Sequence, residues 1–343
     1  MNHDDSMIAN VLRACDERRD ARRAFLRTAG QASFVAAGAA VLAACDDSND
    51  DIVVRPTPTP SPTPTPTPSP TTPAPSVQDV LNFALNLEYL EAQFYSFAAF
   101  GTGLADNLLS GTGTQGAVRG GRRVAFSDPA IARFAREIAQ DEVAHVAFLR
   151  QALGTSAIAQ PQINLGTGSG DAFSAAARAA GLIGESESFD PFSSDENFLL
   201  GAFLFEDVGV TAYKGSSPLL ISNKPFLEAA AGILAVEAYH AAMIRTTLYR
   251  KGVETPTLID KTEAISNARD ALDGTSDIDQ GIRSQGSGAD QAANIVPTDG
   301  NAVAFSRTPG QVLNIVYLNK AAVEQGGFFP AGVNGAVRLS QAN

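Results

Sequence analysis

Two Glu-x-x-His sequences hold the side chains of this chain that are best suited to bind a metal. They are Glu142 with His145 and Glu237 with His240, and the third histidine of the 343 residues is His3. Residues three apart lie on one face of a helix, with ~5–6 Å between their Cβ atoms. Imidazole nitrogen suits iron, manganese or zinc better than calcium or magnesium. We therefore predict that both pairs contribute to one metal site.

The segments around the two pairs have the period of amphipathic helices. In each, apolar residues recur in alternating steps of three and four, and the Glu-x-x-His pair interrupts this apolar stripe. The alternative, two unrelated core histidines, leaves the matching interruptions unexplained. The same periodicity predicts four long helices, near residues 77–100, 128–153, 194–214 and 224–251.

The first and third predicted helices also carry carboxylates on apolar stripes. Glu88 and Glu91 lie in the first, and Glu206 lies among apolar neighbours in the third, where the alternative is a carboxylate on the helix surface. An unpaired buried carboxylate costs several kcal/mol, so a compensating cation is expected. The period alone does not distinguish Glu88 from Glu91. Tyr95 and Tyr213 are either hydrogen-bond partners of the ligands or simple core residues.

Composition restricts the class of protein. Apolar residues make up 44 % of the chain and charged residues 18 %, a balance that can form a full core. The formal net charge of -12, with no basic cluster in the body, argues against nucleic acid as a partner. Both cysteines, Cys15 and Cys45, lie in the N-terminal segment, so the body is expected to have neither a disulfide nor a thiolate ligand.

The N-terminal segment has the layout of an export signal. A basic stretch containing Arg22 and Arg23 precedes an apolar run over 32–44, and the pair resembles the twin-arginine type, although an ordinary basic region is the alternative. The run ends at Cys45, which resembles a lipoprotein acylation site; a plain signal with a chance cysteine is the other interpretation. We predict an exported protein, periplasmic or in the cell envelope, with a membrane lipid anchor at Cys45, on the inner or the outer membrane.

These features divide the chain into four predicted parts. They are an export signal (1–45), a Pro/Thr-rich linker (46–75), a four-helix bundle (76–252) and a C-terminal extension that packs on the bundle (253–343). Residues 101–126 are predicted as a loop. Shorter helices are predicted over 171–182, 257–273 and 308–324.

The order of the candidate ligands resembles that of ferritin-like di-iron and di-manganese proteins. In that class, one Glu from each of two helices joins a Glu-x-x-His from each of two others. The resemblance implies six ligands, with Glu91 as the substitute for Glu88: Glu88, Glu142, His145, Glu206, Glu237 and His240. It also implies that Glu142 and Glu237 bridge two metal ions, iron or manganese with zinc as a further option. The fold implied is an all-α, ferritin-like four-helix bundle with long loops and a partly helical C-terminal region.

The first helix, together with Gly326-Gly327-Phe328-Phe329-Pro330 near the end of the chain, resembles the desiccation-related ferritin-like family over residues 76–343. Membership of that family would not settle the activity. The expected pair of redox-active metals predicts an oxidoreductase, ferroxidase-like or manganese-catalase-like, that acts on dioxygen, peroxide or ferrous iron, and the family suggests a role in stress or desiccation protection. Its partner is then a small-molecule oxidant or a metal ion. The alternatives are a non-catalytic, tethered protective protein whose metals only stabilise the bundle, and a module that binds a cell-envelope partner. The oligomeric state is left open.

Overall fold

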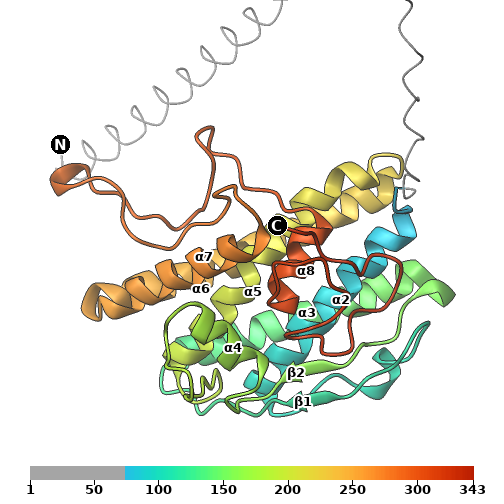
Figure 1. Ribbon diagram of the computed structural model, residues 1–343, viewed down its shortest axis with the longest axis horizontal. Helices are drawn as coiled ribbons and strands as arrows, with labels where there is room; N and C mark the ends of the chain where they lie inside the picture. Colours follow the sequence, from blue (N-terminus) through green and yellow to red (C-terminus); the bar gives the residue numbers. More distant parts are fainter. Residues whose placement is uncertain (1–73) are drawn as a thin grey trace, which may run out of the picture. The chain divides into compact units, whose positions relative to one another are not determined.

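Four long helices form a bundle in the computed structural model, which describes residues 74–343 (Figure 1). They are α2 (Val77–Phe100), α3 (Pro129–Leu153), α5 (Asp195–Ser216) and α6 (Lys224–Glu254). The predicted all-α four-helix architecture is confirmed. The predicted export signal, its Cys45, and the predicted linker up to residue 73 lie outside the described residues.

The four helices differ in how much of their surface is covered. Nearly every residue of α2 and α5 is buried, whereas α3 and α6 each bury one stripe and expose the opposite face. α3 packs extensively against α2, and α6 against α5, while α3 and α6 meet over a shorter stretch. Of the neighbouring pairs in the bundle, α3 and α6 therefore have the least contact.

Each helix of the bundle begins at a residue whose side chain accepts a backbone N–H of the first turn. Such caps satisfy donors that have no partner within the helix. Ser76 forms a reciprocal pair with Asp79 at the start of α2. The other three caps are Asp128, Ser194 and Asn223. Sequence therefore fixes where each ligand-bearing helix starts.

The connections contain short elements that periodicity does not reveal. The predicted loop after α2 includes η1 (Asp106–Leu108) and β1 (Val118–Gly120), and the crossover from α3 to α5 includes η2 (Gly154–Ser156), β2 (Ile163–Leu165) and α4 (Ala172–Ala179). β1 and β2 pair in parallel, with Val118 opposite Ile163. Three-residue strands are too short to show an alternating pattern, so periodicity could not predict them. Helix α4 is shorter than the predicted 171–182.

The C-terminal extension contains α7 (Thr257–Asp273), η4 (Gly288–Asp290) and α8 (Pro309–Tyr317), and η3 (Ser217–Leu220) joins α5 to α6. The prediction of a helix over 308–324 is wrong at its end, because Leu318 adopts a left-handed φ of 54° and stops the helix. The chain then turns back at Gly327, with a φ of 47°, and the N–H of Phe328 donates to the carbonyl of Val316 at 2.9 Å.

A buried ionic network attaches the extension to the bundle. Asp207 of α5 pairs with Arg245 of α6 at 2.7 Å and with Arg269 of α7 at 3.0 Å. Arg269 also pairs with Asp279 at 2.6 Å, and Arg307 pairs with Asp279 at 2.8 Å. Arg307 completes the network with Asp273 at 2.6 Å. Three buried arginines thus neutralise three buried aspartates across α5, α6, α7 and the segment before α8.

Candidate metal centre

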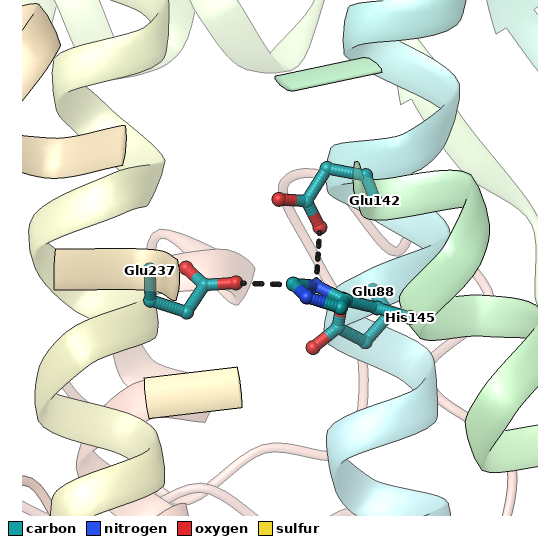
Figure 2. Close-up of side chains that lie close together, drawn as sticks. All are labelled: Glu88, Glu142, His145 and Glu237. Atoms are coloured by element: carbon teal, nitrogen blue, oxygen red, sulfur yellow. Dashed lines mark hydrogen bonds and ion pairs between the residues drawn. The ribbon is translucent and has the colours of Figure 1, made fainter. Parts of the chain in front are cut away.

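The bundle brings all six predicted ligands to one interior space. Figure 2 shows Glu237 of α6 reaching across toward side chains from α2 and α3. The candidate ligand atoms form two groups, and within each group they lie within 4.8 Å of one another. The first group is Glu88, Glu142, His145 and Glu237, and the second is Glu142, Glu206 and His240. Glu142 belongs to both groups.

His145 lies at the centre of the first group. Its Nδ1 is 3.2 Å from Glu88 Oε2, 3.5 Å from Glu142 Oε2 and 3.8 Å from Glu237 Oε1. Residue His145 is 9 % exposed, the most of the six, while Glu88, Glu142 and Glu237 are fully buried. One imidazole nitrogen therefore faces three carboxylates in an almost closed space.

His240 occupies the second group and has a further partner outside it. Its Nδ1 is 3.0 Å from Glu142 Oε1 and 3.7 Å from Glu206 Oε2, and its Nε2 is 3.1 Å from Asp141 Oδ2. A carboxylate bound to one ring nitrogen fixes the tautomer and directs the other nitrogen inward. Sequence reasoning missed Asp141. The sequence feature that could have pointed to Asp141 is its position directly before Glu142.

Two tyrosines hold ligand carboxylates. The hydroxyl of Tyr95 donates to Glu206 Oε1, and that of Tyr213 donates to Glu88 Oε1. Both side chains are buried, so these tyrosines serve the core as well as the centre. Each hydrogen bond occupies one carboxylate oxygen and leaves the other directed at the group of ligands.

Glu91, the predicted substitute for Glu88, is also buried at this centre. Burial raises its pKa well above the ordinary range, and the Glu142 and Glu206 carboxylates raise it further. Glu88 rather than Glu91 belongs to the first ligand group, in which its Oε2 contacts the imidazole of His145. The two residues that the helical period could not separate thus occupy different positions.

The centre has an excess of acidic groups. Burial raises the pKa of Glu88 to about 7 and that of Glu206 to about 8, with Glu142 adding to both shifts. Burial alone would lower the pKa of each histidine, but the adjacent carboxylates raise it to about 11 in His145 and about 9 in His240. Burial would likewise raise the pKa of Glu142, yet the two neighbouring imidazoles, His145 and His240, lower it to about 2. Two imidazoles do not balance this set of carboxylates.

Whether metal ions fit this centre can be judged from the ligand atoms that have no hydrogen-bond partner. Among residues 74–343, several buried atoms of the centre have no hydrogen-bond partner: both oxygens of Glu142 and of Glu237, Oε2 of Glu206 and Nδ1 of His240. Leaving such atoms unsatisfied is costly. Carboxylate oxygens combined with imidazole nitrogens on four helices are the donor set of two divalent transition metals. The residues present therefore fit such a pair.

Gly209 of α5 makes room for one of these carboxylates. A Cβ at this position would lie 2.3 Å from Glu237 Oε2 and 3.5 Å from Glu91 Oε1. Glycine inside a helix costs about 1 kcal/mol relative to alanine. The sequence offered only the presence of a glycine in the middle of a long helical segment, and its role at the centre was missed.

A four-helix bundle whose helices direct two Glu-x-x-His pairs and further glutamates at a common interior point is a ferritin-like protein. A family model described as "Ferritin-like domain" matches residues 76–250, and the chain belongs to this family. The predicted family is thus confirmed.

Two curated relatives extend the comparison beyond the bundle. The chain is 30 % identical to "Ferritin-like catalase Nec2" of Nesocodon mauritianus over 267 residues, which cover 76 % of this chain and 84 % of the relative. It is 31 % identical to "Desiccation-related protein PCC13-62" of Craterostigma plantagineum over 245 residues, which cover 68 % of this chain and 75 % of the relative. No solved structure gives a significant match.

Proposed function

We propose that this protein is an oxidoreductase that breaks down hydrogen peroxide at a pair of iron or manganese ions. The observation that carries the proposal is the pair of ligand groups joined by Glu142. When bound, two such ions supply two one-electron changes, which together match the two-electron chemistry of peroxide. The name of one relative, a ferritin-like catalase, supports the same activity.

Each side chain of the centre has a separate task in this proposal. Glu142 reaches both ligand groups and is the shared carboxylate. Glu237, which we also expected to bridge, belongs to the group of His145. The Tyr95 and Tyr213 hydroxyls hold Glu206 and Glu88, and Asp141 orients His240. The surrounding apolar residues keep bulk water away from the buried carboxylates.

Turnover by the full chain loaded with manganese or with iron tests this proposal. We expect oxygen release from hydrogen peroxide, which Glu142→Gln abolishes. Glu137→Gln, a change at an exposed position on the same helix, should leave turnover intact. Oxidation of ferrous iron without peroxide turnover would instead identify a ferroxidase, and peroxide turnover that persists in Glu142→Gln would refute the proposed centre.

A structural role for the metals is the second candidate. The ligand carboxylates are buried almost completely, so a cation there would stabilise the bundle whether or not it reacted. The name of the second relative, a desiccation-related protein, agrees with a protective role. Bound zinc, no turnover with any metal, and a large loss of thermal stability on chelation would favour this role over catalysis.

We also propose that the protein is exported and anchored to a membrane through an acylated Cys45, as the N-terminal sequence suggests. Acylation should move the protein to the membrane fraction of its host. Cys45→Ser should release it in soluble form. An equal distribution of the two variants between the soluble and membrane fractions would rule out the anchor.

A further inference from the structure

The outer face of α6 is exposed and largely apolar. By length and composition α6 could cross a membrane, yet only 33 % of its most apolar 18-residue window is buried. Its inner face carries Glu237, His240 and Arg245, which are fixed inside the bundle. The outer face carries small residues such as Gly232 and Ala235, and it is centred on Tyr239, which is 71 % exposed. Contiguous exposed apolar surface of this kind marks an interaction site.

Charged residues at the two ends of this face have a self-complementary order. Lys224 and Glu254 each lie fifteen residues from Tyr239, on opposite sides, and Glu228 and Arg250 each lie eleven residues from it. Eleven residues are about three helical turns, so Glu228 and Arg250 point to the same side as Tyr239. All four charged residues are exposed, and within residues 74–343 none of them forms an ion pair.

We propose that a second copy of this chain covers this face, with its α6 antiparallel to the first and a two-fold axis at Tyr239. In that arrangement Glu228 of each copy meets Arg250 of the other, and Lys224 meets Glu254. Symmetric dimers use the same patch on both copies, so such a patch must complement itself. The small residues between the charged ends allow the two helices to approach closely.

The dimer would also change access to the metal centre. A cleft of about 510 Å³ lies between α3 and α6, and its lining includes Glu137, Asp141, Tyr239 and His240. It opens between the two least closely packed neighbours of the bundle, where Asp141 contacts His240. The two-fold axis places Tyr239 of the second copy beside the mouth of this cleft. Dimerisation would therefore shield the partly exposed Asp141 carboxylate, which contacts the His240 imidazole, from bulk solvent.

A membrane surface is the competing occupant, and the charges argue against it. Anionic lipid attracts basic clusters, whereas each end of the α6 face pairs one cation with one anion, and α3 adds Glu137 and Asp141 beside the cleft. A mixed pattern in which each charge meets its opposite when the helix is reversed suits another α6 better than it suits lipid.

A charge exchange between Glu228 and Arg250 tests the dimer. The full chain is used with Cys15→Ser and Cys45→Ser, which removes both native thiols and any acylation. We expect sedimentation to show a dimer that Glu228→Arg or Arg250→Glu alone weakens roughly tenfold, because two exposed pairs become repulsive. The double change Glu228→Arg/Arg250→Glu should restore the affinity. Within one chain these residues lie ~33 Å apart, so restoration requires contact between copies.

Cysteine cross-linking supplies an independent measurement. Tyr239→Cys should form a disulfide-linked dimer under mild oxidation, whereas Ser186→Cys in an exposed loop should not. A monomer at every concentration would overturn the proposal, as would a dimer that the charge exchange does not restore or that residue 239 does not cross-link. Binding of the monomer to lipid vesicles, lost in Tyr239→Glu, would assign this face to a membrane instead.

Discussion

The change Glu206→Gln is predicted to have opposite effects on the stability of the metal-free protein and on metal binding. Burial, followed by the Glu142 carboxylate, raises the pKa of Glu206 from 4.5 to about 8. Between these pH values the folded protein holds the proton more tightly than the unfolded chain does. The free energy of unfolding therefore falls as pH rises through this range.

The size of this effect follows from the shift. Because one pKa unit is worth about 1.4 kcal/mol, ionisation of Glu206 costs the folded, metal-free protein on the order of 4 kcal/mol at pH 8 and less than about 1 kcal/mol at pH 5. Glutamine has nearly the same shape and no charge to bury. Glu206→Gln should therefore stabilise the metal-free protein by a few kcal/mol at pH 8 and leave it almost unchanged at pH 5.

Urea denaturation of the chelator-treated protein at the two pH values measures this difference, and metal titration measures the opposite effect. Because Glu206 belongs to the second ligand group, the glutamine variant should bind metal more weakly. Glu137→Gln, an exposed change on α3, provides the control and should alter neither quantity. A glutamine variant that is destabilised equally at pH 5 and pH 8 would show that ionisation of Glu206 does not destabilise the folded, metal-free protein.

Three further changes test other contacts. Asp141→Ala removes the acceptor that orients His240 and should lower metal affinity by roughly 10–100-fold in a chelator competition; unchanged affinity would remove Asp141 from the centre. Gly209→Ala places a Cβ 2.3 Å from a ligand carboxylate oxygen, so we expect a lower melting temperature and less bound metal, although alanine favours a helix by about 1 kcal/mol elsewhere. Arg307→Met leaves the buried Asp273 without an arginine and Asp279 with Arg269 alone, and it should cost on the order of 3–5 kcal/mol in urea denaturation. Arg283→Met at an exposed pair should cost about 0–1 kcal/mol, and similar costs for the two variants would contradict the network.

Much of the bundle could be predicted from the sequence, because each ligand-bearing helix repeats one simple pattern. Glu142 and His145 interrupt an apolar stripe, and the residues of that stripe are buried on one face of α3, as the spacing indicated. The predicted helix starts also lie at or next to residues that cap the observed helices, such as Ser76 and Ser194. The apolar stripes of the four helices then converge on one interior, because each apolar face must be covered by the other helices.

The features that were missed depend on contacts between distant residues. Asp207 directly follows Glu206 in the sequence, and its burial depends on Arg245 and Arg269, which lie far along the chain. The end of α8 depends on one left-handed residue, Leu318, in a sequence that is otherwise compatible with a helix. The space at Gly209 exists only because Glu237 points at it from another helix. The hydrophobic periodicity of a single helix contains no information about these contacts between distant residues.

The buried arginines also determine when the centre can close during synthesis. His240, the last of the six ligands to be translated, leaves the ribosome well before Arg269 and Arg307. Until Arg269 emerges, Asp207, on the same helix as Glu206, lacks one of its cations. Asp279 follows Arg269 in the chain and lacks its second arginine until Arg307 emerges. A nascent chain that already contains every ligand therefore still holds α5 loosely, and we expect the metals to enter the finished polypeptide rather than the growing one.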